Sequence, residues 1–328
     1  MKALKVWSIT DGGAGMLSQS EGLARALNEN FVRKNCKIKS WLRFLPVTLQ
    51  TWLFPYILER REDFTSKPDI AIGVGRDSIP ALRWIKKHCP QTFTIYGQNP
   101  GLLQAHHFDL VIATEHNYFK SKNTISTKFA LHKLTKPILN KAAKEFSYLF
   151  KDKPKPWRSI VIGGKAPHYS FGAKETMRLI EDIEQIAKSG GSIFITPSRR
   201  TGQENIDLIE KALKKFGDQI YLYKYDQEEK NPYIGMLALS DELYITEDSV
   251  SMISEACYTG KPVILLPLEN FKRNSIRKFT QHLLSKKRVA YLSGKEELTS
   301  IGQQDDKEMD MIAAQVKKIV ENHFRLTK

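Results

Sequence analysis

Short apolar runs and helical patterns alternate along this chain, and the alternation restricts its fold more than any other sequence feature. In the first half, four runs rich in apolar and β-branched residues are bounded by Gly, Pro or Asp, with helical patterns between several of them. The predicted strands are residues 4–10, 69–74, 92–96 and 110–114, and residues 78–88 are a predicted helix. Strands that alternate with helices form parallel sheets covered by helices on both faces. We therefore expect an α/β, doubly wound domain.

A charged stretch with two prolines interrupts the alternation at residues 151–156. Because Pro154 and Pro156 cannot continue a helix, this stretch is the predicted linker between two domains. The alternation then begins again, with strands predicted at 159–162, 192–196, 219–223, 242–246, 262–266 and 289–292 and helices at 174–189, 205–216, 233–239, 249–259, 275–286 and 308–323. The 328 residues suffice for two domains of about 150 residues each.

The predicted architecture is two Rossmann-like, doubly wound domains that face each other across a cleft. The first covers residues 1–150 and the second residues 157–328, although the last helix could pack back on the first domain. Ligands of open α/β sheets bind at the carboxyl ends of the strands. The loops that follow the strands are therefore the places where a site is expected.

A glycine-rich loop at residues 11–15 follows the first strand and leads into a helical pattern. Ser18 and Glu21 have the spacing of a capping box, in which each side chain bonds to the backbone N–H of the other residue. This spacing predicts a helix that begins at Ser18 and runs to about Asn28.

The positive charge of the chain is concentrated in its first half. Lys and Arg number 51 against 36 Asp and Glu, for a formal net charge of +15. Residues 1–150 hold 22 basic and 11 acidic side chains, a balance of +11, so the remainder, with 29 against 25, carries +4. A basic half indicates a surface for nucleic acid, anionic lipid or a phosphorylated substrate, or a solvated face without a partner.

Composition and cysteine spacing argue against several protein classes. A hydrophobic content of 41% and a charged content of 27% are typical of a folded globular protein. No apolar run approaches the roughly 18–20 residues that span a bilayer. The first ten residues enter a strand directly, so we expect a cytoplasmic protein without a targeting segment. Cys36, Cys89 and Cys257 lack CxxC spacing, which argues against a disulfide framework and a structural zinc site.

Two loops of the second half carry residues expected around a diphosphate. Gly163, Gly164 and Lys165 follow a predicted strand, where glycine lets a phosphate approach the backbone and lysine adds charge. The P-loop pattern is absent, and the two glycines could form only a tight turn. Residues 198–201, Ser-Arg-Arg-Thr, end the next strand. Arginine donates two parallel hydrogen bonds to a phosphate, and the hydroxyls can bind the remaining oxygens.

A third loop carries acidic residues. Glu247, Asp248 and Ser249 end a strand and open a helix, whose N-terminal amides form an anion site. Glu255 lies eight residues after Glu247 on that helix, and a carboxylate there could accept both hydroxyls of a ribose. Asp248 or Ser249 could also serve as a helix cap alone.

Asn231 precedes a proline at the start of a helical pattern. Proline is favoured at the first helical position, which makes Asn231 the predicted N-cap, with a ligand contact as the alternative. The full set of residues predicted to bind the donor is Gly163, Gly164, Lys165, Ser198, Arg199, Arg200, Thr201, Asn231, Glu247, Asp248, Ser249, Val250, Ser251 and Glu255.

These segments together resemble a known family. The spacing of Glu247 and Glu255, with Gly-Lys-Pro-Val after the helix, is similar to the E-x7-E arrangement in the nucleotide-sugar half of GT-B glycosyltransferases. Four elements in combination resemble the mitochondrial-fission ELM-like family of glycosyltransferases: residues 11–15 with Gln19 and Gly22, the pair Gly163-Gly164, residues 198–201, and residues 231–233 ahead of 247–252. The resemblance spans about residues 4–270. Gly13 stands where the family more usually has lysine, which argues against a phosphate role for the first loop.

The resemblance implies a nucleoside-diphosphate sugar as the donor and co-substrate, with no further cofactor. GT-B enzymes generally neutralise the leaving diphosphate with cationic side chains and helix amides, so no obligatory metal is predicted. The N-terminal half would then bind the acceptor. Asp11, Glu115 and His116 are the candidate bases for an acceptor hydroxyl, although Asp11 could instead only brace the glycine turn. The residues predicted to bind the acceptor are Gly12, Gly13, Gly15, Gln19, Arg76 and Gln98.

Residues 41–56 are apolar and aromatic, and Arg60 and Arg61 follow them. Such a segment can dock on a membrane, with its apolar side in the acyl boundary and its basic residues on headgroups. It can also be a helix packed on its own sheet.

The sequence thus predicts a cytoplasmic GT-B glycosyltransferase that acts on a glycan or glycolipid of the cell envelope. It would be peripheral to the inner leaflet if residues 41–56 dock there. A non-catalytic scaffold protein with the same fold is the first alternative. A nucleic-acid-binding protein is the second, but no recognised nucleic-acid module is present, so nucleic acid is not an expected partner.

Overall fold

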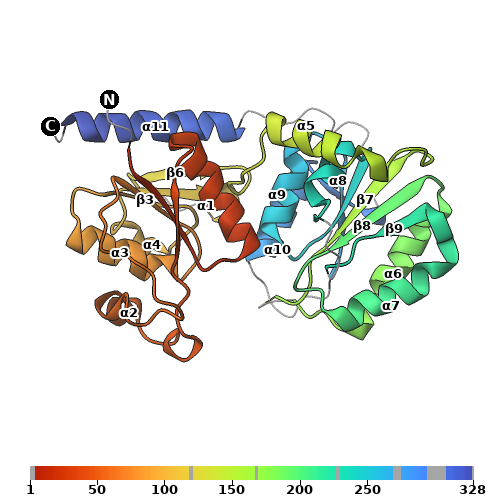
Figure 1. Ribbon diagram of the computed structural model, residues 1–328, viewed down its shortest axis with the longest axis horizontal. Helices are drawn as coiled ribbons and strands as arrows, with labels where there is room; N and C mark the ends of the chain where they lie inside the picture. The colour runs from red at the N-terminus through yellow and green to blue at the C-terminus, as the bar shows by residue number, and fades with distance from the viewer. Residues whose placement is uncertain are drawn as a thin grey trace. The chain divides into compact units, whose positions relative to one another are not determined.

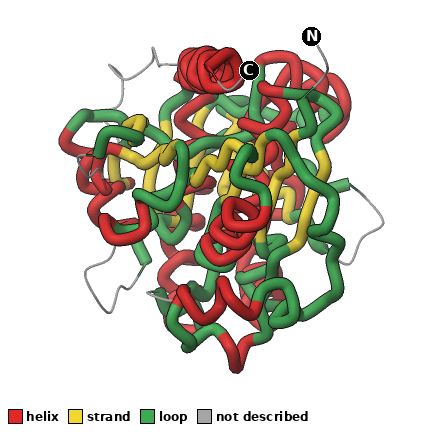
Figure 2. Tube along the Cα trace, turned by 90° about the vertical axis from the view of Figure 1, so that its left-hand side faces the viewer, coloured by secondary structure: helices red, strands yellow, loops and turns green. Residues whose placement is uncertain are grey.

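The computed structural model describes residues 4–117, 121–166, 169–225, 230–268, 275–293 and 308–326 (Figure 1). Its contacts divide the chain into unit 1, Met1–Lys133 with Lys307–Lys328, and unit 2, Leu134–Asp306. Each unit contains one parallel six-stranded sheet, as the alternation in the sequence predicts. Figure 2, which faces unit 1, shows the strands gathered inside and the helices outside.

The sheet of unit 1 has the strand order β2-β1-β3-β4-β5-β6. Its strands are β1 (Val6–Thr10), β2 (Val32–Asn35), β3 (Ile70–Gly73), β4 (Phe93–Tyr96), β5 (Leu110–Thr114) and β6 (Thr124–Thr127). Its helices are α1 (Ala14–Leu27), α2 (Val47–Leu53), α3 (Ser78–His88), α4 (Leu102–Ala105) and α11 (Glu308–Leu326). From β1 the chain adds β2 on one side and β3 to β6 on the other, so the strand order reverses between β1 and β3. Open α/β sheets bind ligands at such a point.

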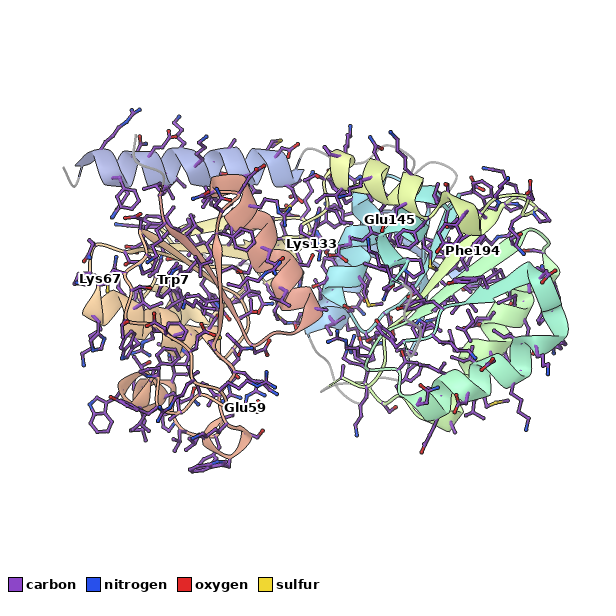
Figure 3. All side chains as sticks on the ribbon, in the orientation of Figure 1. Trp7, Glu59, Lys67, Lys133, Glu145 and Phe194 are labelled. Carbon is purple, nitrogen blue, oxygen red and sulfur yellow. The ribbon has the colours of Figure 1, made fainter. Side chains whose placement is uncertain are left out.

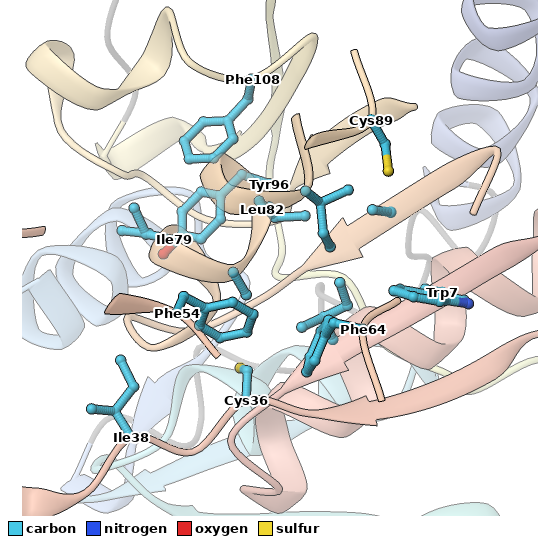
Figure 4. Packing of buried hydrophobic residues seen from close by; sticks show 14 of the residues in the cluster. Trp7, Cys36, Ile38, Phe54, Phe64, Ile79, Leu82, Cys89, Tyr96 and Phe108 are labelled. Carbon is cyan, nitrogen blue, oxygen red and sulfur yellow. The ribbon is translucent and has the colours of Figure 1, made fainter. Parts of the chain in front are cut away.

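Successive residues of β1 point to opposite faces of this sheet, and each face has its own apolar cluster. Val6 packs in the cluster with residues of α1 and α11, including Val316. Trp7 packs in the other cluster, which includes Leu82 of α3 and Phe64. Figure 4 shows Trp7, Phe64 and Phe54 close together in this second cluster. Helix α11 therefore completes the core of unit 1 although it lies at the far end of the chain.

The sheet of unit 2 has the strand order β12-β11-β10-β7-β8-β9. Its strands are β7 (Trp157–Ile162), β8 (Ser192–Pro197), β9 (Ile220–Leu222), β10 (Glu242–Thr246), β11 (Val263–Leu266) and β12 (Ala290–Tyr291). Its helices are α5 (Lys136–Glu145), α6 (Ala173–Lys188), α7 (Gln203–Leu213), α8 (Tyr233–Leu239), α9 (Val250–Tyr258) and α10 (Ser275–Ser285). This is the Rossmann strand order, with the reversal between β7 and β10.

The boundary between the two units differs from the predicted one. The sequence places the end of the first domain at residue 150, whereas the contacts assign the chain from Leu134 onward to unit 2. Helix α5 packs on α8, and the Phe150 ring stacks on Phe194 with the centroids 3.8 Å apart. The proline stretch is also tied to unit 2, because the Ser192 hydroxyl donates to the carbonyl of Pro154. Figure 3 shows Glu145 and Phe194 within this unit.

Helix α1 begins four residues earlier than the capping-box spacing predicts. Gly13 is its N-cap, and Ser18 and Glu21 lie buried inside the helix. Their side chains serve tertiary contacts: the Ser18 hydroxyl accepts the N–H of Lys133 at 3.3 Å, and Glu21 pairs with Arg33 at 2.6 Å. The predicted capping box is therefore wrong, because both side chains bind partners outside the helix.

The ten strands predicted from the sequence are present, with ends shifted by a few residues. Strands β2 and β6 and helices α4 and α5 were not predicted. Strand β2 (Val-Arg-Lys-Asn) and β6 (Thr-Ile-Ser-Thr) contain few apolar residues, since both lie at the edges of their sheet. Edge strands bury less side-chain area than central strands, so their apolar pattern is weak.

We expect Gly22→Ala to lower the free energy of unfolding by about 1–3 kcal/mol. A Cβ at Gly22 would lie 2.1 Å from the backbone carbonyl oxygen of His132, so the helix and the loop beside it would have to separate. This clash outweighs the gain of about 1 kcal/mol in helix propensity. Urea denaturation measures the change. Arg25→Ala, on the exposed side of the same helix, is the control and should stay within about 0.5 kcal/mol; a Gly22→Ala protein as stable as the parent would contradict the packing.

Candidate functional site

The loops after β7, β8 and β10 meet at one edge of the sheet in unit 2. Strand β7 lies between β8 and β10 in the sheet, and the reversal of the strand order falls between β7 and β10. The predicted donor residues of these loops are therefore neighbours in space. Hydrogen bonds between the loops confirm this: the N–H of Gly163, after β7, donates to the Thr246 hydroxyl at 2.7 Å.

The two glycines after β7 make room for Asp248. The N–H of Gly164 donates to Asp248 Oδ2 at 3.1 Å. A Cβ at Gly163 would lie 2.1 Å from both carboxylate oxygens of Asp248. A Cβ at Gly164, whose φ is +153°, would lie 2.2 Å from the backbone of Arg200. Glycine is thus required here by contacts within the protein, whether or not a phosphate approaches the loop.

Asp248 and Arg200 form an ion pair that joins the loops after β10 and β8. Arg200 Nη2 lies 2.7 Å from Asp248 Oδ2, and the Asp248 side chain is fully buried while that of Arg200 is 39% exposed. Arg200 Nη1 also donates to the Gly164 carbonyl at 3.3 Å, and Asp248 Oδ1 accepts the Thr246 hydroxyl at 2.7 Å. The pair therefore links three loops. We call Arg200, Asp248, Thr246, Gly163 and Gly164 the loop clamp.

The hydroxyls of the loop after β8 point toward β7 and bind its backbone. Ser198 Oγ donates to the Gly163 carbonyl at 2.6 Å, and Thr201 Oγ1 donates to the same oxygen at 2.5 Å. Arg199 and Lys165 differ from these residues, because both side chains are exposed. Within the described residues neither forms an ion pair. The structure thus separates the two adjacent arginines: Arg200 belongs to the loop clamp, and Arg199 is exposed outside it.

Glu247 and Ser249 support the start of α9. Glu247 is buried; its carboxylate accepts the N–H of Leu268 at 3.2 Å and the hydroxyl of Tyr291 at 3.1 Å. Burial raises the pKa of Glu247, and desolvation together with Glu247 raises the pKa of Tyr291 to about 12. Ser249 is the N-cap of α9, with its hydroxyl accepting the N–H of Met252 at 3.4 Å. Val250 and Ser251 follow as the first residues of the helix.

Glu255 and Asn231 are connected through Tyr233. The hydroxyl of Tyr233 donates to Glu255 Oε2 at 2.6 Å, and Glu255 is buried on α9. Desolvation and the adjacent carboxylate raise the pKa of Tyr233. Asn231 Oδ1 accepts the N–H of Tyr233 at 2.9 Å, and Asn231 Nδ2 donates to the hydroxyl of Tyr225 at 3.2 Å. The backbone makes Pro232 the N-cap of α8, one residue after the predicted position, but the Asn231 side chain does accept the N–H of the first helical residue, Tyr233.

Sequence reasoning missed Thr246, Tyr233, Tyr225 and Tyr291 as residues that hold the site. Thr246 is the last residue of β10 and directly precedes the acidic loop, so its position in the sequence could have identified it as a site residue. Tyr291 contacts Glu247 from 44 residues further along the chain, and no local pattern indicates that contact.

The predicted acceptor residues of unit 1 lie on α1 and in the loops after β1, β3 and β4. Asp11 Oδ1 accepts the N–H of Gly13 at 3.0 Å, so this carboxylate does brace the glycine turn. Gly12 has a φ of +90°, and Gly15 lies in the first turn of α1. Gln19, which is buried, accepts a hydrogen bond from Gln98 at 3.4 Å. The structure therefore brings Gln98, after β4, together with Gln19 of α1.

The candidate bases of unit 1 do not meet. Glu115 and His116 follow β5, and β3 and β4 separate β5 from β1, the strand that Asp11 follows. At about 4.8 Å per strand this separation is roughly 14 Å. His116 Nε2 is hydrogen bonded with Asn117 at 2.9 Å, and Arg76 donates to the carbonyl of Arg43 at 2.7 Å. Asp11 and the Glu115–His116 pair are therefore alternatives for a base and cannot act together on one proton.

The described residues contain neither a metal-binding cluster nor a helix suited to a membrane. No cluster of three or more His, Cys, Asp or Glu side chains in the described ranges is placed to hold a metal ion. Of the helices in those ranges, none offers the long uncharged stretch that crossing a bilayer requires.

Comparison with known sequences places the chain among named relatives. A family model described as mitochondrial fission ELM1 matches residues 14–320. The mitochondrial fission protein ELM1 of Arabidopsis thaliana is 30% identical over 256 residues, which are 71% of this chain and 59% of that protein. The match thus spans less than two thirds of that relative. The UDP-N-acetylglucosamine–N-acetylmuramyl-(pentapeptide) pyrophosphoryl-undecaprenol N-acetylglucosamine transferase of Christiangramia forsetii is 25% identical over 298 residues, 83% of this chain and 75% of that protein.

Solved structures resemble the chain along nearly its whole length. The UDP-GlcNAc 2-epimerase of Methanocaldococcus jannaschii matches with a TM-score of 0.54 and 12% identity, covering 96% of this chain and all of that one. At this identity the likeness shows the fold alone. It confirms the predicted α/β fold of GT-B type, built from two Rossmann-like domains.

We expect Arg200→Gln and Arg199→Gln to differ in stability. Arg200→Gln leaves the buried carboxylate of Asp248 without its cation and should lower the free energy of unfolding by about 1–3 kcal/mol. Arg199→Gln, one residue away and exposed, is the matched control and should change it by no more than about 0.5 kcal/mol. Urea denaturation of both variants measures the difference. Adding Asp248→Asn to Arg200→Gln should recover part of the loss; equal stability of the two single variants would contradict the loop clamp.

Proposed function

The chain belongs to the mitochondrial fission ELM1 family, and from this premise we propose that it is a glycosyltransferase that moves a sugar from a nucleoside-diphosphate sugar to an acceptor hydroxyl. One observation carries the proposal. At the reversal of the Rossmann strand order in unit 2, the loop clamp holds Arg199 and Lys165 exposed on adjacent loops, next to the N-terminus of α9. Exposed cations beside helix amides are the groups that a diphosphate requires.

The departing diphosphate is the proposed ligand of these cations. As the bond between the sugar and the diphosphate breaks, negative charge develops on the diphosphate oxygen. Arg199 can donate two parallel hydrogen bonds to it, and Lys165 adds a second positive charge. The reaction proposed here uses no further cofactor. The bacterial transferase and the archaeal epimerase described above both carry UDP-N-acetylglucosamine or UDP-GlcNAc in their names, so uridine compounds are the first probes.

Glu255 is the proposed partner of the ribose. It lies on α9, one helix turn beyond Ser251, and Tyr233 orients its carboxylate through the 2.6 Å hydrogen bond. A carboxylate held in this way can accept a ribose hydroxyl without first losing rotational freedom.

The acceptor is proposed to bind unit 1. Its hydroxyl would lose a proton to Asp11, or to Glu115 or His116, while its oxygen bonds to the anomeric carbon of the sugar. A glycolipid or polysaccharide of the cell envelope is the proposed acceptor class, in keeping with the lipid-linked substrate in the name of the bacterial transferase.

One observation favours a second candidate, a non-catalytic scaffold protein. Ser198, Thr201, Glu247 and Asp248 all use their polar atoms within the protein, so much of the predicted donor set has a sufficient structural role. Release of nucleoside diphosphate from a nucleotide sugar would contradict the scaffold, and its absence with all common donors, despite donor binding, would support it.

We expect Arg199→Gln to weaken the binding of UDP by about 10- to 100-fold, because a hydrogen bond to a charged group contributes about 1.5–3 kcal/mol. Titration calorimetry of the parent protein with UDP, GDP, CDP and ADP identifies the base, and the preferred nucleotide is then titrated into the variant. Lys165→Gln should act in the same direction. Lys211→Gln, exposed on α7, removes the same charge away from the site and should leave the affinity unchanged. A parent protein that binds none of the four nucleotides would overturn the proposal.

We expect Glu255→Gln to reduce the preference for UDP over 2′-deoxy-UDP. The amide can accept through only one oxygen, and its NH2 group faces donors that must reorient, so the ribonucleotide should lose about 5- to 100-fold in affinity. The deoxynucleotide should lose less. Tyr233→Phe removes the orienting hydroxyl and keeps the carboxylate, so it should retain part of the preference. An unchanged ratio of the two affinities in Glu255→Gln would exclude Glu255 from the ribose site.

A further inference from the structure

Bulky apolar side chains are exposed together on one part of unit 1. Four aromatic residues between positions 41 and 56 have exposed fractions of 67% to 85%. The aromatic surface is defined here as these four and a neighbouring leucine: Trp41, Phe44, Leu49, Trp52 and Tyr56. In the other described parts of the chain, exposed bulky apolar residues are scattered singly, which is normal for a protein surface.

The segment that carries the aromatic surface packs with its inner side on the apolar core of unit 1. Leu42, Val47 and Leu53 pack against the apolar cluster beneath, and Phe54 is buried edge-on against Phe64 with the ring centroids 4.8 Å apart. Helix α2 lies against α3, as Figure 1 also shows. The sequence left open whether this segment packs on its own sheet or faces a membrane. In the structure its inner side packs and its outer side is exposed.

Gln50 fixes the loop that presents Trp41 and Phe44. This residue is buried, and its Nε2 donates to the carbonyls of Leu42, Arg43 and Leu45 at 3.3, 3.2 and 2.8 Å. The exposed aromatic rings therefore stand on an ordered framework. These rings are thus exposed while the segment that carries them is folded and hydrogen bonded.

Positive charge surrounds the aromatic surface. Residues 37–61 contain five Lys or Arg and one Glu, and Arg43 is the one charged residue from 40 to 58. Arg60 and Arg61 are exposed directly after the segment, and exposed Arg76 donates to the carbonyl of Arg43 at 2.7 Å. Arg43 pairs with the buried carboxylate of Asp77 at 3.0 Å, so the positive charge beside the apolar, aromatic segment comes from the exposed Arg60, Arg61 and Arg76.

We propose that the aromatic surface docks on an anionic phospholipid membrane. Trp and Tyr favour the interface of a bilayer, where the ring meets acyl chains and the polar atom stays in contact with water. Arg60, Arg61 and Arg76 would meet the phosphates of the headgroups, each cation near the surface adding to the attraction. An acidic protein partner would match these arginines, but a segment that exposes five bulky apolar groups and has Arg43 as its one charged residue from 40 to 58 matches acyl chains better. The proposal is independent of the sugar transfer proposed above.

Vesicle binding of the full chain tests this surface. We expect the protein to sediment with phosphatidylcholine vesicles that contain about 30% phosphatidylglycerol, and much less with phosphatidylcholine alone. Trp41→Ser with Trp52→Ser should reduce the partition coefficient about tenfold or more. Arg60→Gln with Arg61→Gln should cause a loss of similar size, which added salt should imitate. Brominated acyl chains should quench the tryptophan fluorescence of the parent and not that of the tryptophan variant.

The matched control replaces exposed apolar residues elsewhere. Tyr148→Ser with Met311→Ser removes two side chains with exposed fractions of 58% and 66% and should leave vesicle binding unchanged. Three outcomes would overturn the proposal: a parent protein that does not sediment with anionic vesicles, a tryptophan variant that binds them as the parent does, or equal binding to neutral vesicles. A parent dimer in sedimentation velocity that the tryptophan variant does not form would assign the surface to self-association instead.

Discussion

The ion pair between Asp248 and Arg200 is the interaction on which the candidate site of unit 2 depends. A carboxylate with no exposed surface is stable only when it is fully paired, and Asp248 receives a guanidinium, a hydroxyl and a backbone N–H. These three donors come from the loops after β8 and β7 and from the end of β10. One buried charge therefore fixes the relative positions of the loops that follow three adjacent strands.

The pairing of Asp248 gives several residues of the predicted donor set a structural role. The two glycines after β7 admit the Asp248 carboxylate, and Arg200 neutralises it, so these four residues of the predicted donor set make contacts within the protein itself. Arg199 and Lys165 are left exposed on the loops that these contacts hold. The loops that carry these cations are already positioned before a ligand binds, which lowers the backbone entropy lost on binding. The same contacts are also compatible with a scaffold, because they need no ligand.

Strand order explains which sequence predictions could succeed. Apolar patterns are strong in the central strands, which are buried on both faces, and the ten predicted strands include all of these. The edge strands β2 and β6 were missed because their side chains are partly solvated. The Ser18–Glu21 spacing wrongly predicted a capping box. The same two residue types at the same spacing also occur inside a helix, where here both side chains make tertiary contacts. The division at Leu134 could not be read from the sequence either, since it depends on α5 packing against α8.

The sequence by itself determined the two α/β domains, the strand ends that carry the candidate residues, and the family resemblance, because periodicity and short motifs are local properties of the chain. Only the tertiary structure decided which of two adjacent arginines pairs with a buried carboxylate and that Tyr233 and Tyr291 bind the two glutamates. It also decided that residues 41–56 bury one side and expose the other. These outcomes depend on residues far apart in the chain, whose approach is set by the packing of helices on the sheets.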